Sequence, residues 1–418
     1  MAQLRQMLLA GLLAGASAAV LVSCAALPAA TTSATAAKPE PSLGGVKHGI
    51  SQERLKQLDA AMKAYVADEK IAGAVVMIQQ DGKDVFSEAY GFRDKEAGDP
   101  MKEDTIFRIA SQSKALTSVA IMMLMEEGKL VLDDPLGKFL PEWQRTTVAA
   151  PRIGGGYDVV PARRAITIRD LLTHTAGISY GAGPGERAWR EAGIYGWYFA
   201  DKREPVSEVV KRMAKLPMTE QPGEQWVYGY NTDILGGVVA KISGQTLEQF
   251  VRTRLTEPLG MVDTSFCLPP EKAARFAVVY SAKDGKIERA PNPGALQGAS
   301  HIGQGHYAGG PCVAFSGGAG LLSTAKDYSR FLEMLRRGGE LDGRRYLSRK
   351  SVELMTSDNL VFATYQPGMG FGLGFRILTD LGKSGQPGSL GEYGWGGAYH
   401  STYWVDRKEG LTVSYMVQ

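Results

Sequence analysis

Residues 111–125 read SQSKALTSVAIMMLM, a polar tetrapeptide followed by a nearly unbroken apolar run. From Ala115 to Met125 no residue is charged, and only Thr117 and Ser118 are polar. A helix that is apolar on all its faces belongs inside a protein. The stretch therefore predicts a helix buried in the core, with the polar tetrapeptide at its N-terminus.

Ser111 and Lys114 stand three residues apart at that N-terminus, a spacing that puts both side chains on one helix face. A serine hydroxyl is a weak nucleophile until a neighbouring base takes its proton. A lysine amine can act as that base where burial keeps a fraction of it neutral. The helix N-terminus also directs free N–H groups at an oxyanion. The pair predicts an acyl-transfer centre with Ser111 as nucleophile and Lys114 as general base.

The composition is that of a globular protein with a large core. The chain has 418 residues, 44% of them hydrophobic, and a formal net charge of +3. It contains no long run of Lys or Arg, which argues against nucleic acid as a partner.

The N-terminal segment, residues 1–24, has the pattern of a signal peptide. Arg5 precedes an apolar run over residues 7–22, which is long enough for a signal core and short for a membrane span. Residues 21–24 (LVSC) resemble the lipobox of bacterial lipoproteins, in which Cys24 would carry the lipid and attach the protein to a membrane. Cleavage within residues 26–30 would instead release a soluble protein. Both readings predict export to the periplasm, with residues 25–45 as a flexible linker.

Two cysteines remain in the exported part of the chain, Cys267 and Cys312. Disulfides persist in oxidising compartments, so a bridge between them is one reading. The alternative is that both residues are small buried thiols, because the sequence gives no distance between them.

Residues 46–418 read as one domain of the α+β class. An amphipathic helix begins at Ser51, and a hairpin follows with its turn at Asp81 and Gly82. Residues 110–310 carry mostly helical signals, and strand patterns return at 370–378, 393–405 and 411–417. This order predicts one antiparallel sheet built from both chain ends, with flanking helices and an inserted helical lobe.

Two later stretches carry residue types suited to the same chemistry, namely residues 222–236 (PGEQWVYGYNTDILG) and 394–398 (GWGGA). The Tyr228 phenol beside a buried cation can relay a proton between the serine and a leaving group. Gly396 and Gly397 would let a ligand approach the backbone closely. An N–H group in this strand could complete an oxyanion hole with that of Ser111.

With these motifs in place, the chain resembles the serine β-lactamase-like superfamily, which includes class C β-lactamases, DD-peptidases and family VIII carboxylesterases. The likeness extends from about residue 50 to the end, where relatives continue into a segment that packs on the sheet and this sequence ends at Gln418. It rests on Phe107 to Lys114, Glu126 to Pro135, Ile166 to Gly177, Glu257 to Met261 and Gly317 to Ala325.

The resemblance implies a role for each matched residue. Ser111 is the nucleophile, Lys114 its base and Tyr228 the tyrosine that assists proton transfer. Gly397 lies in the strand that edges the pocket, and the N–H groups of Ser111 and Ala398 form the oxyanion hole. No cofactor or metal is implied.

Two departures favour the esterase branch. Lactamases carry Tyr-x-Asn where this chain has Tyr228-Gly229-Tyr230, so Tyr230 becomes a candidate pocket residue. They carry Lys-Thr-Gly where this chain has Trp395-Gly396-Gly397. The missing Lys is expected to bind a substrate carboxylate, whereas Trp395 offers an apolar wall suited to an uncharged ester.

The sequence thus predicts a serine hydrolase that cleaves short-chain carboxylic esters through an acyl-enzyme on Ser111. A β-lactamase or DD-peptidase of the same fold, and a non-catalytic penicillin- or peptidoglycan-binding protein, are the alternatives. The expected partner is a small ester or lactam. The oligomeric state stays open.

Other patterns have simpler explanations. The second Ser-x-x-Lys, Ser323 to Lys326, predicts the N-cap of a surface helix. Ser179 lies in a Gly-x-Ser-x-Gly match whose context is inverted for a nucleophile elbow. His174 is expected to satisfy loop backbone groups, and His301 and His306 lack the companions of a metal site.

Overall fold

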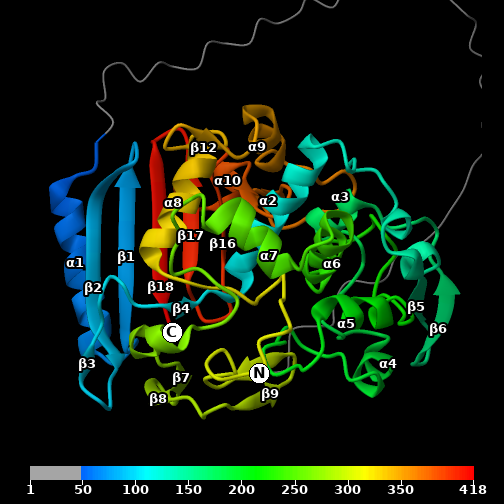
Figure 1. Cartoon of the computed structure of the whole chain (residues 1–418), viewed down its shortest axis with the longest axis horizontal. Coiled ribbons are helices and arrows are strands. Elements are labelled where there is room, and N and C mark those ends of the chain that lie inside the picture. The colour runs from blue at the N-terminus through cyan, green and yellow to red at the C-terminus, as the bar shows by residue number, and fades with distance from the viewer. Residues whose placement is uncertain (1–48) are drawn as a thin grey trace, which may run out of the picture. The chain divides into compact units, whose positions relative to one another are not determined.

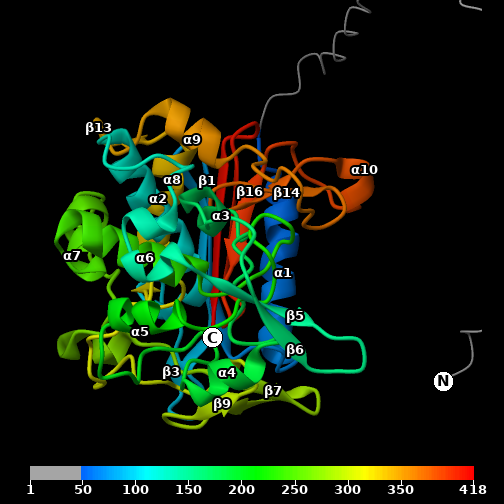
Figure 2. The same cartoon turned by 90° about the vertical axis from the view of Figure 1, so that its right-hand side faces the viewer.

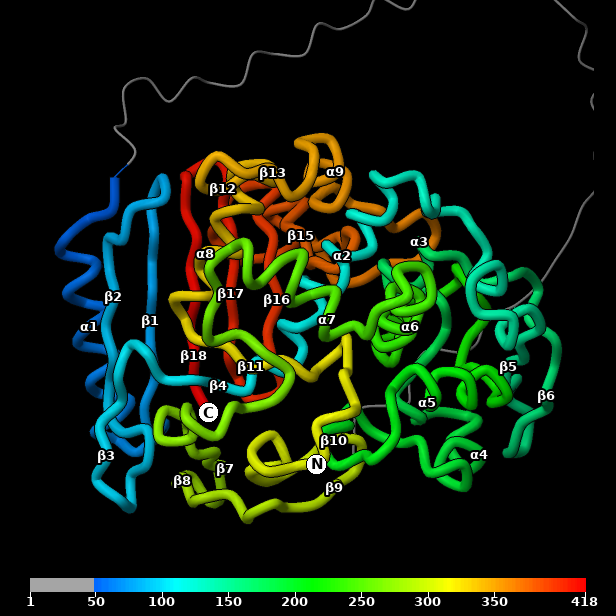
Figure 3. Tube along the Cα trace, in the orientation of Figure 1, coloured from blue at the N-terminus to red at the C-terminus, as the bar shows by residue number. Residues whose placement is uncertain are grey.

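The two ends of the described chain meet in one sheet, as the strand patterns predicted. The computed structural model describes residues 49–418, so the predicted signal peptide, Cys24 and the predicted linker over residues 25–45 lie outside the described residues. Eight antiparallel strands lie in the order β14-β15-β16-β17-β18-β1-β2-β3 (Figures 1 and 3). The last strand, β18 (Leu411–Val417), pairs with the first, β1 (Gly73–Gln80), from Ala74 opposite Val417 to Gln80 opposite Leu411.

The predicted hairpin joins β1 to β2 (Lys83–Asp94), and β3 (Asp99–Pro100) follows at the sheet edge. Asp81 and Gly82 form the turn, with φ angles of 53° and 76°. Positive φ at both central residues matches the right-handed twist of the paired strands, which explains why Asp-Gly stands here.

Helices cover both faces of the sheet. In Figure 2, α1 (Gln52–Ala67) lies on one side of the strands, and α8 (Ala325–Arg336) lies on the other with α2 (Ser113–Glu126). The Ser51 side chain caps α1 by accepting a hydrogen bond from the Arg54 amide. Met62 of α1 packs with Val76 and Tyr90 of the sheet.

The helix after the second Ser-x-x-Lys differs from the prediction. Thr324 is the N-cap of α8, and Ser323 lies one residue earlier in the buried strand β11 (Leu322–Ser323), which pairs with β4 (Phe107–Arg108). The helix is not a surface helix, because it packs on β18 and β1 and buries both Asp327 and Glu333. Its buried charges have partners, since the Asp327 carboxylate accepts from the Thr264 hydroxyl and Glu333 pairs with Arg336.

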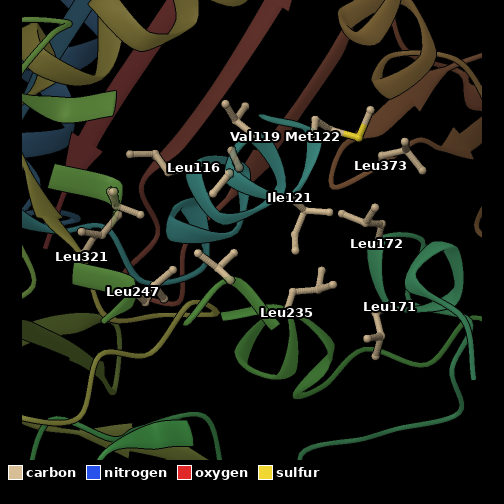
Figure 4. Close-up of a cluster of buried hydrophobic side chains, with 14 of the residues drawn as sticks. Leu116, Val119, Ile121, Met122, Leu171, Leu172, Leu235, Leu247, Leu321 and Leu373 are labelled. Atoms are coloured by element: carbon tan, nitrogen blue, oxygen red, sulfur yellow. The ribbon is translucent and has the colours of Figure 1, made fainter. Parts of the chain in front are cut away.

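The predicted buried helix, α2, is the centre of the core. All its residues from Ser113 to Leu124 are buried. Figure 4 shows its apolar side chains among those of α3 (Ile168–Leu172), α6 (Asn231–Ser243) and α7 (Leu247–Val251). The cluster includes Leu116, Val119, Ile121, Met122, Leu171, Leu172, Leu235 and Leu247. Burying each such side chain is worth about 1.5–3 kcal/mol, so this packing fixes the end of α2 that carries Ser111.

The remaining lobe combines short helices with small hairpins. Its other helices are α4 (Glu186–Glu191) and α5 (Val206–Met213), and its hairpins are β5 (Thr147–Pro151) with β6 (Tyr157–Pro161), β7 (Tyr280–Lys283) with β8 (Lys286–Arg289), and β9 (Ala295–Gln297) with β10 (Ser300–Ile302). Cys267 and Cys312 form a disulfide, with their Cα atoms 5.9 Å apart. Among residues 49–418, none of the helices is both long and apolar enough to span a membrane.

The C-terminal strands are shorter than their sequence patterns suggested. The 370–378 pattern divides into β14 (Met369–Phe371) and β15 (Arg376–Leu378), and the 393–405 pattern into β16 (Tyr393–Gly396) and β17 (Thr402–Asp406). Gly397 and Ala398 therefore lie in the turn after β16 and not within a penultimate strand. Here α9 (Arg349–Met355) and α10 (Leu381–Ser384) lie between strands in the chain.

Candidate active site

Ser111 lies where a short 3-10 turn, Ala110–Gln112, leads into α2. The residue before it, Ala110, has a φ angle of 42°, an uncommon value for a residue with a Cβ atom. Strained backbone persists only where the surroundings enforce it, and it gathers at functional sites. The turn holds the Ser111 side chain at the surface of a cavity while its neighbours Ala110 and Gln112 are buried.

Lys114 lies directly beside Ser111. Its Nζ atom donates to Ser111 Oγ at 3.2 Å, to the Tyr180 hydroxyl at 3.0 Å and to the Gly318 carbonyl at 2.8 Å. The side chain is only 2% exposed. A neutral Lys114 could keep donating to Gly318 and Tyr180 and would then present its lone pair to the Ser111 hydroxyl. The geometry thus fits proton abstraction by Lys114.

The Gly318 carbonyl is held in place by Asp233 from α6. Asp233 Oδ1 accepts hydrogen bonds from the Ser316 hydroxyl at 2.5 Å and from the Gly318 amide at 3.2 Å. Burial raises the pKa of Asp233, and the positive charge of Lys114 opposes that rise. A Cβ atom at position 318 would stand 2.5 Å from Asp233 Oδ2. Glycine is therefore required for this close approach.

Tyr180 is the site residue that the sequence did not reveal. It belongs to the Gly-x-Ser-x-Gly match that was set aside, and no motif marks its contact with Lys114. Burial raises the pKa of the Tyr180 phenol well above its usual value, and the neighbouring Tyr228 adds to the effect. Tyr180 therefore stays protonated near neutral pH and is a partner of Lys114, not a base.

Tyr228 and Trp395 meet across the cavity. The Trp395 indole N–H donates to the Tyr228 hydroxyl oxygen at 3.1 Å, and Lys114 Nζ lies 4.6 Å from the centre of the Tyr228 ring. Tyr228 forms no direct hydrogen bond with Ser111 or Lys114 in the described part of the chain. Because the phenol oxygen accepts from the indole, its own proton is left to donate to another group.

Aromatic side chains surround that pair. Trp226 stacks on Tyr228 with ring centres 5.6 Å apart, and Phe371 meets Trp395 edge-on at 5.4 Å. Tyr365 packs on Trp226 and on Trp395. Tyr365 and Trp395 line the cavity and make that part of its wall aromatic, while Trp226 and Phe371 pack against them. The hydrogen bond from Trp395 to Tyr228 was not predicted from the sequence.

His174 lies behind Tyr228 and not beside Ser111. Its Nδ1 atom is 2.9 Å from the Asn231 side-chain amide, and its ring packs 4.8 Å from that of Tyr228. Burial, aided by the charge of Lys114, lowers the pKa of His174 well below its usual value. His174 is therefore a neutral packing partner whose polar contact is a side chain, where the sequence led us to expect backbone groups.

Ser111 and Ala398 face one cavity of about 570 Å³. Its lining includes Tyr180, Trp197, Tyr228, Ala299, Ser300, Tyr365, Arg376, Trp395, Gly396, Gly397 and Thr402. The Ala398 amide donates no hydrogen bond to any residue within 49–418. A free N–H group in the same cavity as a serine hydroxyl is what an oxyanion hole requires.

Gly397 brings this turn close to the nucleophile. Its amide donates to the Ser401 carbonyl at 2.7 Å, and an added Cβ atom would stand 2.5 Å from the Ile109 carbonyl oxygen. The missing side chain thus allows the turn after β16 to pack on the backbone that precedes Ser111.

Two residues of interest lie outside the cavity. Tyr230, expected as a pocket residue, is fully buried, donates its hydroxyl to the Gly196 carbonyl at 2.7 Å and packs edge-on against Tyr180. Ser179 donates to the Ala182 carbonyl at 2.6 Å. Neither side chain lines the cavity that holds Ser111.

The charged groups of residues 49–418 include no cluster of three or more His, Cys, Asp or Glu side chains that could hold a metal ion. The groups gathered around Ser111 are instead an amine, two phenols and backbone amides and carbonyls. That set is suited to nucleophilic acyl transfer.

Comparisons with known proteins find similar sequences over most of the chain. Residues 58–418 match the family model described as Beta-lactamase. Esterase EstB from Burkholderia gladioli is 33% identical over 377 residues, which cover 85% of this chain and 88% of that protein. Protein Rv1367c from Mycobacterium tuberculosis (strain ATCC 25618 / H37Rv) is 36% identical over 367 residues, covering 83% and 86%.

A solved structure is similar over nearly the same extent. EstCE1, described as a hydrolase with promiscuous acyltransferase activity, superposes with a TM-score of 0.76 at 26% sequence identity. The match covers 88% of this chain and 93% of that one.

Proposed function

Since the chain belongs to the beta-lactamase family, we propose that this serine hydrolase is a carboxylesterase that cleaves short-chain esters through an acyl-enzyme on Ser111. The observation that carries the proposal is the contact between Lys114 Nζ and Ser111 Oγ at 3.2 Å, at the edge of a cavity walled by Trp395. The similarity to esterase EstB supports the choice of ester over lactam.

The reaction begins with proton transfer. Lys114 takes the proton of Ser111, whose oxygen attacks the ester carbonyl carbon. The carbonyl oxygen becomes an oxyanion, which the N–H groups of Ser111 and Ala398 stabilise. Gly318 and Tyr180 hold Lys114 in place throughout, because both are hydrogen-bonded to its amine.

The second half of the reaction releases the two products. Collapse of the tetrahedral intermediate expels the alkoxide, which takes a proton from the Tyr228 phenol. The Trp395 N–H bond to the phenol oxygen stabilises the charge that develops there. The Lys114 ammonium then gives its proton to the Tyr228 phenolate, which restores both groups. Water attacks the acyl-enzyme and loses a proton to Lys114, and the second tetrahedral intermediate collapses to the free acid as the Ser111 oxygen takes that proton back.

Initial rates test this proposal with 4-nitrophenyl butyrate and a chromogenic cephalosporin. We expect ester turnover by the wild type and a loss of at least about 10⁴-fold in kcat for Ser111→Ala. Ser179→Ala is the matched control, because Ser179 stands in the Gly-x-Ser-x-Gly match and its hydroxyl bonds to Ala182 and Thr219.

The outcome separates the candidate functions. A strong preference for the cephalosporin would move the protein to the β-lactamase or DD-peptidase branch, with the same nucleophile. Ligand binding without turnover would favour a penicillin-binding protein that is not a catalyst. Ester activity that survives in Ser111→Ala would contradict the assignment of the nucleophile.

We also propose that the protein is exported to the periplasm, with Cys24 as the lipidated residue. The disulfide between Cys267 and Cys312 supports an oxidising compartment. Expression of the full chain in a bacterium, followed by fractionation and mass measurement of the mature N-terminus, tests it. A lipid adduct on Cys24 that disappears in Cys24→Ala is the expected result, and an unprocessed chain in the cytoplasm would contradict export.

A further inference from the structure

Arg376 places a positive charge in the cavity that holds Ser111. It lies at the start of β15, between Phe371 of β14 and Gly394 of β16 in the strand register. It lines the same cavity as Ser111, Tyr228 and Trp395. No sequence motif includes Arg376. It reaches the cavity because its strand, β15, pairs with β16, and that pairing could not be read from the sequence.

The Arg376 guanidinium has no bonded partner. It forms no ion pair and no hydrogen bond with any residue that the structure describes. Glu392 lies within electrostatic range without forming an ion pair, and burial raises the pKa of its carboxyl while the charge of Arg376 opposes that rise. Charged side chains are seldom buried unless they are paired, so the N–H donors of this partly buried arginine are available to an anion in the cavity.

The cavity contains no group that could neutralise this charge. Its lining residues include no Asp and no Glu. The Tyr365 phenol, whose pKa burial raises, is uncharged near neutral pH. A substrate that enters therefore meets the positive charge of Arg376, the one Lys or Arg residue among the described residues that line the cavity.

We propose that Arg376 binds a carboxylate carried by the substrate, so that the preferred esters of this enzyme are monoesters with a free carboxylate. The inference rests on the proposed esterase function and names its substrate class. The planar guanidinium has five N–H donors and binds a carboxylate through two parallel hydrogen bonds.

Arg376 also alters the meaning of Trp395. In the sequence, Trp395 stands where lactamases carry the lysine of Lys-Thr-Gly, and this substitution indicated an uncharged ester. In the structure, the positive charge comes from β15, the strand that pairs with β16. The aromatic wall of Trp395 and Tyr365 then contacts the apolar part of the substrate between its ester and its carboxylate.

Paired substrates test this inference. The first pair is 4-nitrophenyl hydrogen glutarate and its neutral methyl ester, which place the carboxylate on the acyl side. The second is 3-carboxy-4-nitrophenyl butyrate and 4-nitrophenyl butyrate, which place it on the alcohol side. The quantity compared is the ratio of kcat/KM for the charged over the neutral ester, in the wild type and in Arg376→Met.

We expect the ratio to fall about 10- to 100-fold in Arg376→Met for one of the two pairs, and less in Arg376→Lys, which keeps the charge without the planar fork. Arg203→Met, which removes an exposed arginine that does not line the cavity, should leave the ratio unchanged. Unchanged ratios for both pairs in Arg376→Met would overturn the inference.

A binding measurement separates this inference from the proposed function. Ser111→Ala cannot turn over, so calorimetry can give the dissociation constant of 4-nitrophenyl hydrogen glutarate and of 3-carboxy-4-nitrophenyl butyrate for that variant and for Ser111→Ala with Arg376→Met. We expect one of these two esters to bind at least about 10-fold more weakly after loss of Arg376, and more weakly in high salt. That result would support the carboxylate site even if the protein is no esterase. Equal binding of both by the two variants would refute it even if ester turnover is fast.

Discussion

The indole N–H of Trp395 donates a hydrogen bond to the hydroxyl oxygen of Tyr228, over 3.1 Å. This bond joins strand β16 to the tyrosine that precedes α6, 167 residues earlier in the chain. It fixes the phenol oxygen and leaves its proton free for the leaving group. Trp395 is therefore a positioning residue as well as part of the cavity wall.

Trp395→Phe keeps an aromatic ring and removes that N–H donor. We expect kcat for ethyl butyrate, whose alkoxide needs the Tyr228 proton, to fall about 10- to 100-fold, because a hydrogen bond to a charged group is worth about 1.5–3 kcal/mol, with a smaller change in KM. Trp226→Phe is the matched control, because the Trp226 indole N–H is buried without a partner among the described residues. Equal losses in both variants would mean that only packing matters at Trp395.

Tyr180→Phe removes the hydroxyl that contacts Lys114 and keeps the ring. Since a hydrogen bond to a charged group is worth about 1.5–3 kcal/mol, we expect kcat to fall about 10- to 100-fold. Tyr230→Phe also removes a buried phenol hydroxyl, but one that bonds to the Gly196 carbonyl away from Lys114. That variant should lose stability in thermal melts and keep kcat close to the wild type. The reverse pattern would contradict the role of Tyr180.

Gly318→Ala tests the support of Lys114 from the backbone. The new Cβ atom would stand 2.5 Å from Asp233 Oδ2, so the loop and its carbonyl must shift away from Lys114 Nζ. We expect a loss of kcat together with a lower melting temperature. Gly237→Ala on α6 meets only ordinary contacts, at 3.5 Å from Val210, and should be neutral or stabilising. Full activity in Gly318→Ala would show that the carbonyl is dispensable.

The buried His174 predicts how stability depends on pH. Its folded pKa is lowered well below its usual value, so the unfolded chain binds the extra proton as the pH falls below about 6.5. The contribution of a neutral His174 is full above that pH and is lost at about 1.4 kcal/mol per pH unit below it, down to the folded pKa. Denaturant titrations between pH 7 and pH 5 should show a shallower slope for His174→Gln. Equal slopes of unfolding free energy against pH in the wild type and His174→Gln would mean that His174 binds its proton equally well in the folded and unfolded states.

Sequence periodicity anticipated the parts of the molecule that depend on local patterns. The apolar run after Ser111 is a buried helix, the Asp81–Gly82 turn joins a hairpin, and strands from both ends pair through β1 and β18. Each of these features follows from the spacing of apolar residues or from a residue pair that tolerates positive φ. Both kinds of signal can be read directly from the sequence.

The contacts that sequence did not reveal are all long-range. Tyr180 and the Gly318 carbonyl reach Lys114 across 66 and 204 residues. Arg376 enters the cavity because β15 pairs with β16, and the division of 370–378 into two strands was hidden by a glycine-rich pattern. The prediction that Tyr230 lines the pocket was wrong. It rested on the position of Tyr230 in a motif, whereas its side chain is buried by Trp189 and Tyr180, which come from another part of the sequence.

The most direct test of the account is covalent labelling with a 4-nitrophenyl alkylphosphonate, which traps the serine of an acyl-enzyme. We expect one equivalent of 4-nitrophenol to be released, one phosphonyl group to appear in the intact mass, and peptide mapping to place it on Ser111. The label should be absent from Ser111→Ala and should form far more slowly in Lys114→Met. A label on another residue, or an unlabelled wild type, would contradict the central claim that Ser111 is the nucleophile.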